Sequence, residues 1–367
     1  MDQQIRILHV VTYMGRGGLE TMIMNYYRHL DRNKVQFDFL VHRDFRADYD
    51  DEIEALGGKI YRLPQLVPWS KCYLNALERF FRAHPEYKIV HVHQDCLSSV
   101  ILKMAKKCGI PIRIAHSHNS SQDKNLKYLI KLHYKRSIPT YATQLFACGE
   151  EAGRWMFGSA PFRVVNNAID SKRYSYNQQK NHEIRSTLHI PQDALVVGHV
   201  GRFNAVKNHT FLLEVFSEIN QQDENSVLLL VGDGVLRREM EQKARSLDIS
   251  KSVIFTGVRS DVPDLMQAMD CFVFPSLYEG IPVTLIEAQA AGLPCIISDG
   301  VPEECAKTNL VKCIPLSVGV HAWADAILKS KNGFRQDTRK EITEAGYDID
   351  ENAQWLQNFY LEQWKDA

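Results

Sequence analysis

The stretch CFVFPSLYEGIPVTLIE, residues 271–287, combines a buried strand, a short loop and the start of a helix. Its first four residues are uniformly apolar, as in a strand of a parallel sheet that is covered on both faces. Pro282 suits the first turn of a helix, because that position needs no amide hydrogen. A strand, a loop and a helix start in this order indicate an open α/β sheet whose unpaired backbone N–H groups converge on an anion.

Two glutamates bracket this predicted anion site. Glu279 lies in the loop and Glu287 about a turn and a half inside the helix. Carboxylates only accept hydrogen bonds, so beside an anion they suit neutral hydroxyls such as those of ribose and a sugar. The same stretch is also typical of a capped helix with two surface glutamates.

A second loop carries two cations. The apolar strand 195–200 is followed by GRFNAVKN, residues 201–208. Gly201 permits a tight turn, the guanidinium of Arg202 can fork onto two phosphate oxygens, and Lys207 adds a point charge. Two cations on one loop are usually just solvated. These two follow a strand, where open parallel sheets bind their ligands, so they favour a phosphate site.

Five further segments join these two loops to complete a pattern that spans most of the chain. They are Gly17-Gly18-Leu19-Glu20, Ala115-His116-Ser117-His118, Asn167-Ala168-Ile169-Asp170, Val231-Gly232-Asp233-Gly234 and Thr256-Gly257. In this order they resemble the retaining glycosyltransferases of family 4, and among these the bacterial members that build capsular or exopolysaccharide repeat units. The chain departs from the family at Ala168, where glycine is common, which weakens the domain boundary more than the active site.

The resemblance implies the GT-B fold, an α/β architecture of two Rossmann-like parallel-sheet domains that face a cleft. We expect an N-terminal acceptor-side domain over residues 1–170 and a C-terminal nucleotide-sugar-binding domain over 171–350. The polar segment 170–182 is interpreted as the linker. The resemblance also implies that residues 351–367 form a helix that crosses back onto the first domain. The wide aromatic face of residues 352–364 must be buried against something, so it suits this role.

The alternation of short apolar runs with amphipathic stretches agrees with βα units around parallel sheets. The predicted strands of the first domain are 5–11, 35–41, 59–63, 89–93, 110–115 and 144–147. Those of the second domain are 195–200, 227–231, 253–255, 271–274 and 295–298.

The resemblance also implies roles for individual residues. Transfer of a hexose from a nucleotide diphosphate sugar, most simply a UDP-sugar, places developing negative charge on the diphosphate. Arg202, Lys207 and the helix start near Pro282 and Val283 would stabilise that charge. His116 would contact the transferred sugar; His91, His93 and His118 compete for this role, with His118 as the first alternative. The predicted catalytic residues are His116, Arg202, Lys207 and Glu279.

The predicted donor site comprises residues from both domains. Glu287 is assigned to the ribose, the amides of Gly280 and Ile281 to the sugar together with Glu279, and the backbone at Val258 and Arg259 to the base. The full donor-binding set is Gly17, Gly18, Gly201, Val258, Arg259, Gly280, Ile281, Pro282, Val283 and Glu287. Glu20 is assigned to the acceptor side, and a plain tight turn remains the alternative for the Gly17-Gly18 loop.

Several classes of function are disfavoured. Lys+Arg and Asp+Glu are equal at 44 each in 367 residues, unlike a nucleic-acid-binding protein. The first glycine-rich loop lacks the Gly-x-Gly-x-x-Gly spacing of nicotinamide enzymes. Asp-x-Asp strings at 48–50 and 348–350 lie in polar stretches and are interpreted as solvated acids. We therefore expect no metal and no cofactor.

The predicted partners are the nucleotide-sugar donor and a lipid-linked or oligosaccharide acceptor. The N-terminus lacks the features of a signal peptide and no apolar run reaches about 20 residues, so we expect a cytoplasmic protein, at most peripheral on the inner face of the membrane. Lys124, Lys127, Lys131 and Lys135 share a face that either rests on anionic lipid or is an ordinary basic surface. Two rival functions remain, a UDP-sugar epimerase of the same fold and a non-catalytic partner subunit.

Overall fold

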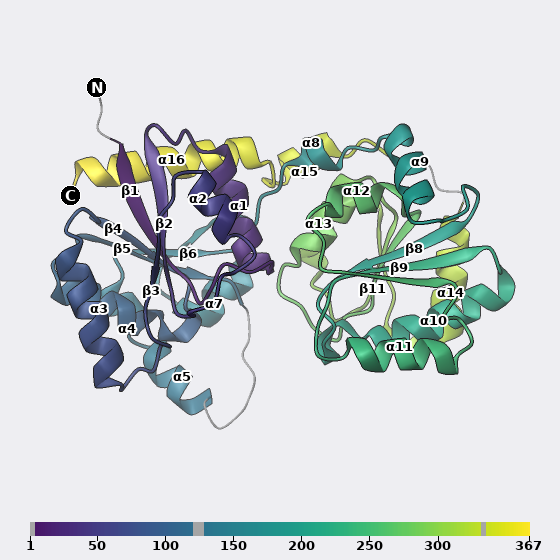
Figure 1. Ribbon diagram of the computed structural model, residues 1–367, viewed down its shortest axis with the longest axis horizontal. Coiled ribbons are helices and arrows are strands. Elements are labelled where there is room, and N and C mark those ends of the chain that lie inside the picture. Colours follow the sequence, from purple (N-terminus) through teal and green to yellow (C-terminus); the bar gives the residue numbers. More distant parts are fainter. Residues whose placement is uncertain (1–3, 120–127, 332–334) are drawn as a thin grey trace. The chain divides into compact units, whose positions relative to one another are not determined.

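The structure is a computed structural model that describes residues 4–119, 128–331 and 335–367. The chain divides into two units (Figure 1). The first comprises Met1–Ala168 together with Ile349–Ala367, and the second comprises Ile169–Asp348. Each boundary lies two residues before the one expected from the sequence.

The first unit is built on a parallel sheet of seven strands in the order β3-β2-β1-β4-β5-β6-β7. The chain first adds strands on one side of β1, up to β3, and then returns to add β4 and the later strands on the other side of β1. Ile7 of β1 is in register with Phe37 of β2 on one side and with Ile89 of β4 on the other. The strands are β1 (Ile5–Val10), β2 (Val35–Val41), β3 (Ile60–Arg62), β4 (Ile89–Val92), β5 (Ile112–Ser117), β6 (Gln144–Ala147) and β7 (Arg163–Val164).

Helices cover both faces of this sheet, because alternate strand residues point to opposite sides. Ile7 belongs to the apolar cluster beneath α1 and α16, whereas Leu8 belongs to the cluster beneath α3 and α4. The helices of this unit are α1 (Gly18–His29), α2 (Asp50–Ala55), α3 (Lys71–Ala83), α4 (Ser98–Lys107), α5 (Tyr128–Lys135), α6 (Ile138–Tyr141), α7 (Glu150–Phe157) and α16 (Ile349–Lys365).

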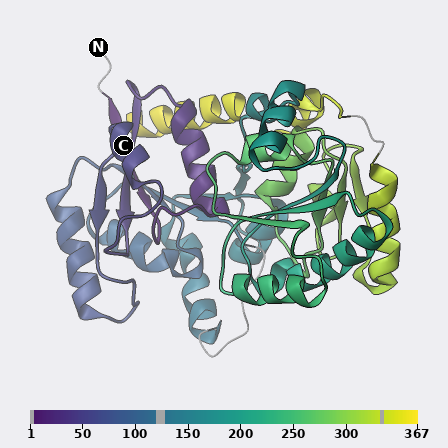
Figure 2. The same ribbon diagram turned by 45° about the vertical axis from the view of Figure 1, so that its right-hand side comes forward.

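The return of the chain to its first unit is confirmed. Figures 1 and 2 both show α16, in yellow, beside the purple helix α1. The rings of Trp355 and Phe359 lie 5.9 and 5.1 Å from the ring of Phe146 on β6. Leu356 and Tyr360 are buried against the sheet. The aromatic face that was predicted for residues 352–364 therefore packs against the sheet of the first unit.

The second unit repeats the architecture with six parallel strands in the order β10-β9-β8-β11-β12-β13. Its strands are β8 (Leu195–Val200), β9 (Ser226–Val231), β10 (Val253–Gly257), β11 (Cys271–Phe274), β12 (Cys295–Ile297) and β13 (Val311–Cys313). Its α-helices are α8 (Ser171–Tyr174), α9 (Gln178–Thr187), α10 (His209–Gln222), α11 (Arg237–Ser246), α12 (Val262–Gln267), α13 (Val283–Ala290), α14 (Gly319–Ser330) and α15 (Arg339–Glu344). Here the direction of winding reverses between β8 and β11.

Two local predictions are wrong. The presumed linker 170–182 contains α8 and the start of α9, because Asn177 caps α9 by accepting a hydrogen bond from the Lys180 amide at 3.0 Å. The strand expected at 110–115 runs instead over Ile112–Ser117. Pro111 has no amide hydrogen to give to a ladder, so the strand begins after it.

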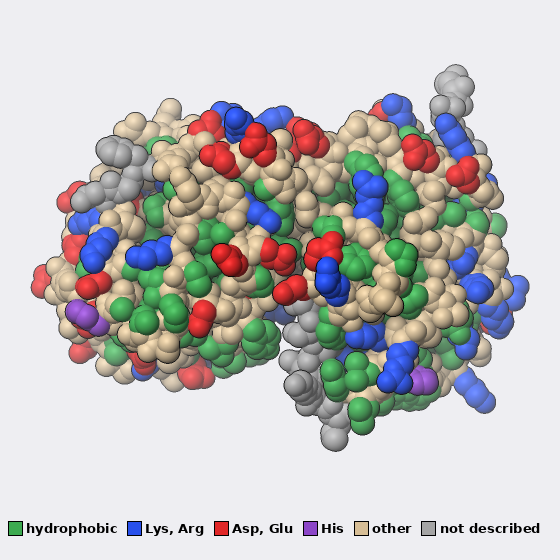
Figure 3. Space-filling view, turned by 180° about the vertical axis from the view of Figure 1, so that it is seen from behind, with side chains coloured by type: hydrophobic (Ala, Val, Ile, Leu, Met, Phe, Trp, Pro, Cys, Tyr) green, Lys and Arg blue, Asp and Glu red, His purple; other side chains and the backbone are tan. Residues whose placement is uncertain are grey.

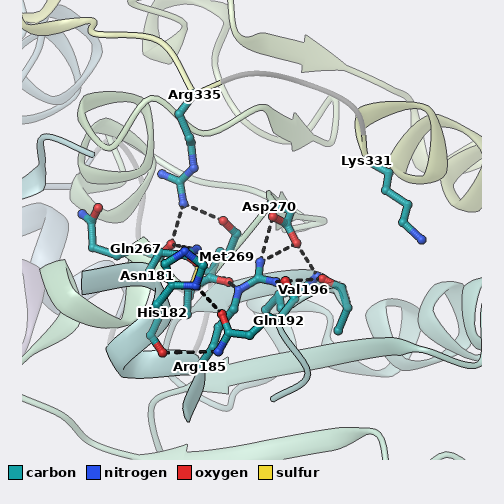
Figure 4. Close-up of polar contacts among 12 residues, drawn as sticks. Asn181, His182, Arg185, Gln192, Val196, Gln267, Met269, Asp270, Lys331 and Arg335 are labelled. Carbon is teal, nitrogen blue, oxygen red and sulfur yellow. Dashed lines mark hydrogen bonds and ion pairs between the residues drawn. The ribbon is translucent and has the colours of Figure 1, made fainter. Parts of the chain in front are cut away.

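A network of hydrogen bonds and an ion pair lies at the amino-terminal ends of strands in the second sheet (Figure 4). Arg185 donates two hydrogen bonds to Asp270, at 2.8 and 2.9 Å, and Asp270 accepts a third from the Val196 amide at 2.7 Å. Arg335 donates to the Met266 and Met269 carbonyls, and burial lowers its pKa to about 10. Asp270 precedes β11 and Val196 lies in β8, so this network holds together the two strands whose opposite ends carry the candidate site.

No helix among residues 4–119, 128–331 and 335–367 is long and apolar enough to cross a membrane. Acidic and basic side chains are interspersed over the face shown in Figure 3, in keeping with their equal numbers.

Candidate active site

The candidate site of the second unit lies at the carboxyl ends of β8 and β11. The winding reverses between these strands, which is the position where open parallel sheets bind ligands. The loops are joined by a hydrogen bond from the Leu277 amide to the Val206 carbonyl at 2.8 Å. The Glu279 amide donates to the Gly300 carbonyl at 3.0 Å, which anchors the second loop to the segment after β12.

The course of the first loop depends on a close approach between backbones. Gly232 follows β9 with a φ of 135°, and a Cβ added there would lie 2.1 Å from the Gly201 carbonyl oxygen. The amides of Gly201 and Phe203 donate to Val231 and Asp233 at 2.9 and 3.0 Å. Glycine at 232 thus sets the position of Gly201 and of the two cations that follow it.

The ammonium of Lys207 binds the carboxylate of Glu279. Their Nζ and Oε1 atoms lie 2.7 Å apart, and their side chains are only 16% and 13% exposed. The same ammonium lies 4.4 Å from the ring centroid of Phe274 on β11. Residues assigned separately to the diphosphate and to the sugar are thereby brought to one point, although 72 positions separate them in the sequence.

Arg202 has a different environment. Its side chain is exposed, and its guanidinium makes no ion pair or hydrogen bond with any residue that the structure describes. The neighbouring Asn204 caps the turn by accepting a hydrogen bond from the Lys207 amide at 3.1 Å. Arg202 is therefore a cation held on an ordered loop and available to an anion.

Helix α13 presents an uncapped amino terminus between the two glutamates. Pro282 is its N-cap with a ψ of 114°, and no side chain accepts from the first amides. Pro282 was expected inside the first turn, but its extended backbone places it before the helix, which begins at Val283. Gly280 and Ile281 are partly exposed just ahead of this terminus. The helix end thus retains donors for an anion.

Glu287 is buried within α13, with 5% of its surface exposed. Burial raises the pKa of its carboxyl to about 6, while a hydrogen bond from Tyr174 and the charge of Arg173 act in the opposite direction. A carboxyl in this setting ionises only near neutral pH, and once ionised it is a strong acceptor for hydroxyl groups.

The predicted contacts to the base lie two strands from β8. Val258 is 54% exposed beyond the end of β10. The guanidinium of Arg259 binds Asp261 at 2.6 and 2.8 Å, so the Arg259 side chain is already engaged. Its backbone and that of Val258 remain the groups that a base would meet, which stays a prediction.

The first unit has its own candidate site at the carboxyl ends of β1 and β5. Gly17 is the N-cap of α1, no side chain caps that end, and Glu20 lies in its first turn. Gly18 is exposed, and a Cβ added to it would meet nothing within 4 Å. The start of α1 is therefore open to a ligand, although the roles of these three residues stay predictions.

His116 lies within β5 rather than after it, and only 2% of it is exposed. Its ring stacks on that of His118 with centroids 4.2 Å apart, so the structure keeps both candidates at one place. Three more histidines surround them: sequence reasoning weighed His91 and His93 only as competitors of His116, and it missed His9. Histidines at the ends of three predicted neighbouring strands were the signal that could have revealed the cluster.

Burial keeps this histidine cluster neutral. It lowers the pKa of His9 and of His118 to about 3, and it lowers those of the other three well below the ordinary value. Neutral imidazoles bind transition metals. Two triads place one nitrogen from each ring within 4.8 Å of one another: His9, His91 and His93, and His93, His116 and His118. These are the residues that could hold a metal ion, and metal-free transfer stays a prediction.

The acidic string at 48–50 is not simply solvated, contrary to expectation. Asp50 is 2% exposed and binds Arg62 at 2.5 Å, because it begins α2 and accepts from the Ala47 amide. Asp48 accepts from the Arg16 amide at 3.2 Å. Both carboxylates are thus engaged in holding the turn beside the Gly17 loop.

The proposed basic face lies only partly within the described chain. Lys124 and Lys127 fall outside the described residues, while Lys131 and Lys135 belong to α5. Lys135 donates to the Trp155 carbonyl and lies 4.4 Å from the centre of the Trp155 ring, so its charge is already engaged. Binding to anionic lipid stays a prediction.

Comparison with known families assigns each half of the chain. Residues 16–173 match the model described as Glycosyltransferase Family 4, and residues 180–347 match Glycosyl transferases group 1. Bacillus subtilis EpsF, named as a glycosyltransferase, is 38% identical over 98% of this chain and 97% of its own. Staphylococcus aureus CapH, named as a capsular polysaccharide biosynthesis glycosyltransferase, is 24% identical over 89% of this chain and 90% of its own.

Two further proteins are similar to this chain. An Escherichia coli enzyme named UDP-Gal:alpha-D-GlcNAc-diphosphoundecaprenol alpha-1,3-galactosyltransferase is 26% identical over 61% of each chain. The crystal structure of Anabaena Alr3699/HepE, in complex with UDP and glucose, matches with a TM-score of 0.79 and 17% identity over 97% of this chain and 99% of that one, a likeness of fold. With two doubly wound units of the GT-B type and a close relative along its whole length, the chain belongs to glycosyltransferase family 4.

Proposed function

We propose that this glycosyltransferase moves a hexose from a UDP-sugar to a hydroxyl of a lipid-linked or glycan acceptor, with retention at the anomeric carbon, during exopolysaccharide or capsule biosynthesis. The observation that carries the proposal is the Lys207–Glu279 pair beside the open start of α13. The UDP complex of HepE supports the donor, and the names of the Escherichia coli enzyme and CapH support the acceptor and the pathway.

The leaving group is stabilised by fixed cations and a helix terminus. As the bond between the anomeric carbon and the phosphate oxygen breaks, negative charge grows on the diphosphate. Arg202 is available on its loop, and Lys207 can exchange its carboxylate partner for a phosphate oxygen. Removal of one such fixed donor typically slows the chemical step by about a hundred- to a thousand-fold.

Donor binding would separate the two members of the pair. Once Lys207 turns to the diphosphate, the Glu279 carboxylate accepts hydrogen bonds from the sugar hydroxyls, together with the amides of Gly280 and Ile281. The exchange keeps both charges partnered, because a carboxylate with 13% exposure is costly to leave alone. The sugar and the diphosphate are thus recognised together.

The remaining roles follow the same chemistry. The ionised carboxyl of Glu287 accepts hydrogen bonds from the ribose hydroxyls. In the first unit, His116 contacts the transferred sugar, Gly17 and Gly18 offer backbone amides to phosphate, and Glu20 serves the acceptor. No side chain is proposed as a covalent nucleophile.

UDP release tests the proposal. The purified full chain is incubated in EDTA with a panel of UDP- and GDP-sugars and with bacterial lipid extract as acceptor. We expect UDP release from one UDP-sugar that depends on the acceptor, and a loss of about a hundred-fold or more in Lys207→Met. Conversion of the donor without release of UDP would establish the epimerase instead. No turnover with any donor would favour the non-catalytic subunit, and strict dependence on a divalent ion would overturn the metal-free leaving group.

A further inference from the structure

Two hydrogen-bonded chains run through the histidine cluster of the first unit. In one, the hydroxyl of Tyr360 on α16 lies 2.7 Å from Nδ1 of His91, and Nε2 of His91 lies 3.1 Å from Nδ1 of His116. In the other, His9 Nδ1 lies 3.1 Å from His93 Nε2, and His93 Nδ1 lies 2.8 Å from His118 Nε2. A tyrosine ends only the first chain.

The direction of the first chain is set by its tyrosine. The Tyr360 hydroxyl lies 2.7 Å from Nδ1 of His91, within hydrogen-bond distance. The hydroxyl proton is buried and needs an acceptor, so Tyr360 is assigned as the donor to His91. A tyrosine hydroxyl has an ordinary pKa of about 10, so it keeps its proton at neutral pH. Among the described residues the hydroxyl has no acceptor other than His91, and a buried donor is costly to leave unpaired.

The hydrogen bond from Tyr360 determines which nitrogen carries the hydrogen in His91, and through His91 also in His116. A neutral imidazole has one N–H and one bare nitrogen. If Nδ1 of His91 accepts from Tyr360, the hydrogen of His91 is on Nε2 and is donated to Nδ1 of His116. The hydrogen of His116 must then be on Nε2. That atom is buried and has no partner among the described residues.

We propose that Tyr360, acting through His91, is a positioning residue that fixes His116 as the Nε2–H tautomer, so that His116 donates a hydrogen bond to an oxygen of the bound substrate. The inference rests on the proposed function for the identity of that substrate. The reverse tautomer would instead leave the proton of the buried Tyr360 hydroxyl without an acceptor among the described residues. The N–H group at Nε2 of His116 thus lies near the carboxyl end of β5, on the side of the sheet where parallel sheets bind ligands.

The second chain lacks this anchor and provides an internal reference. Nε2 of His9 and Nδ1 of His118 have no partner among the described residues, so the hydrogens can run in either direction with one unpaired N–H in both cases. His118 is therefore free to donate or to accept. The difference from His116 is a property that a spectrum can detect.

Histidine tautomers in the full-length protein test the inference directly. Long-range ¹H–¹⁵N spectra of protein labelled at histidine should show His91 and His116 as Nε2–H. In Tyr360→Phe, which removes only the hydroxyl, both should become mixtures while the signals of His9, His93 and His118 stay in place. Tyr73→Phe is the matched control, because the Tyr73 hydroxyl lies 2.9 Å from Nε2 of a different buried histidine, His42. His116 carrying its hydrogen on Nδ1, or unchanged signals in Tyr360→Phe, would overturn the inference.

A double-mutant cycle links the tautomer to turnover. Tyr360→Phe should lower kcat/KM for sugar transfer about 2- to 12-fold, the value of one neutral hydrogen bond, whereas Tyr73→Phe should not. His116→Gln retains an amide donor that needs no tautomer, so adding Tyr360→Phe to it should cause no further loss. A full additional loss would show that Tyr360 acts only through packing.

The two levels of the hypothesis fail in different ways. If the wild-type protein transfers no sugar, the proposed function fails while the spectra still decide the tautomer. Zinc that remains after dialysis against EDTA, with His91 or His116 bound to it, would overturn the hydrogen-bonded chain in favour of a metal site.

Discussion

The buried carboxyl of Glu287 makes the stability of the second unit depend on pH. Its pKa is about 6 in the folded chain, against 4.5 for an ordinary glutamate. The unfolded chain loses this proton near pH 4.5, whereas the folded chain keeps it until about pH 6. Between these values the unfolded state binds fewer protons, so the free energy of unfolding falls as the pH rises.

The size of this effect follows from the pKa difference. About 1.5 units at 1.36 kcal/mol each corresponds to about 2 kcal/mol, fully developed above pH 6. Glu287→Gln has no proton to lose and should lack this component. The free energy of unfolding of Glu287→Gln relative to the wild type should therefore rise by about 2 kcal/mol between pH 4.5 and pH 7.

Hydrogen exchange of the β8 and β11 amides during urea unfolding measures this difference in the second unit alone. Every other group that titrates in the window is common to both proteins, so the difference isolates Glu287. Parallel pH profiles of the wild type and Glu287→Gln would refute the anomalous ionisation.

The same carboxyl should govern the binding of UDP. The ionised form is the stronger acceptor for the two ribose hydroxyls, so wild-type affinity should improve by up to about tenfold from pH 5 to pH 7 for a pKa near 6. Glu287→Gln controls for the ionisation of the nucleotide's own phosphate. Identical pH profiles in calorimetry would remove Glu287 from the ribose site.

Four further substitutions separate binding, catalysis and folding. Lys207→Met should weaken UDP binding about 10- to 150-fold, because it removes a charge-assisted hydrogen bond. Glu279→Gln should keep the affinity for UDP and lower kcat/KM for the UDP-sugar. Equal effects of the two variants on UDP binding in calorimetry would show that the pair has only a structural role. Arg185→Met should lower the free energy of unfolding by about 3 kcal/mol, because it leaves Asp270 without its buried partner; a change below about 1 kcal/mol in urea would contradict this. Gly232→Ala should cost at least about 1–3 kcal/mol and reduce UDP affinity; an unchanged melting temperature would show that the backbones can separate.

The strands of the two sheets were largely predictable, because uniformly apolar runs mark strands that are covered on both faces. The exceptions have physical reasons. β7 and β13 are edge strands of two and three residues with exposed side chains, Arg163 and Lys312 among them, so no apolar pattern marks them. The polar segment before β8 was misjudged because an asparagine cap was interpreted as part of a linker.

The sequence was enough to predict which residues form the candidate site, but not which of these residues contact one another. The sequence identifies Lys207 and Glu279 as site residues, yet their contact depends on how two loops fold back over β8 and β11. Likewise, Tyr360 is indistinguishable from other core aromatics until the fold brings its partner His91 within 3.1 Å of His116, which lies two residues beyond the register partner of His91, Ile114. Pairings between remote segments depend on loop conformation, which local patterns do not specify.

The discontinuous make-up of the first unit has a consequence for biosynthesis. On the ribosome, the segment up to Ala168 is finished long before α16 exists. At about 5–20 residues per second, the intervening stretch takes roughly 10–40 s to synthesise. During that interval the nascent sheet lacks the helix that covers part of one face, whereas the second unit is encoded without interruption. The later-made half can therefore mature first, and the earlier-made half waits for its closing helix to emerge from the exit tunnel.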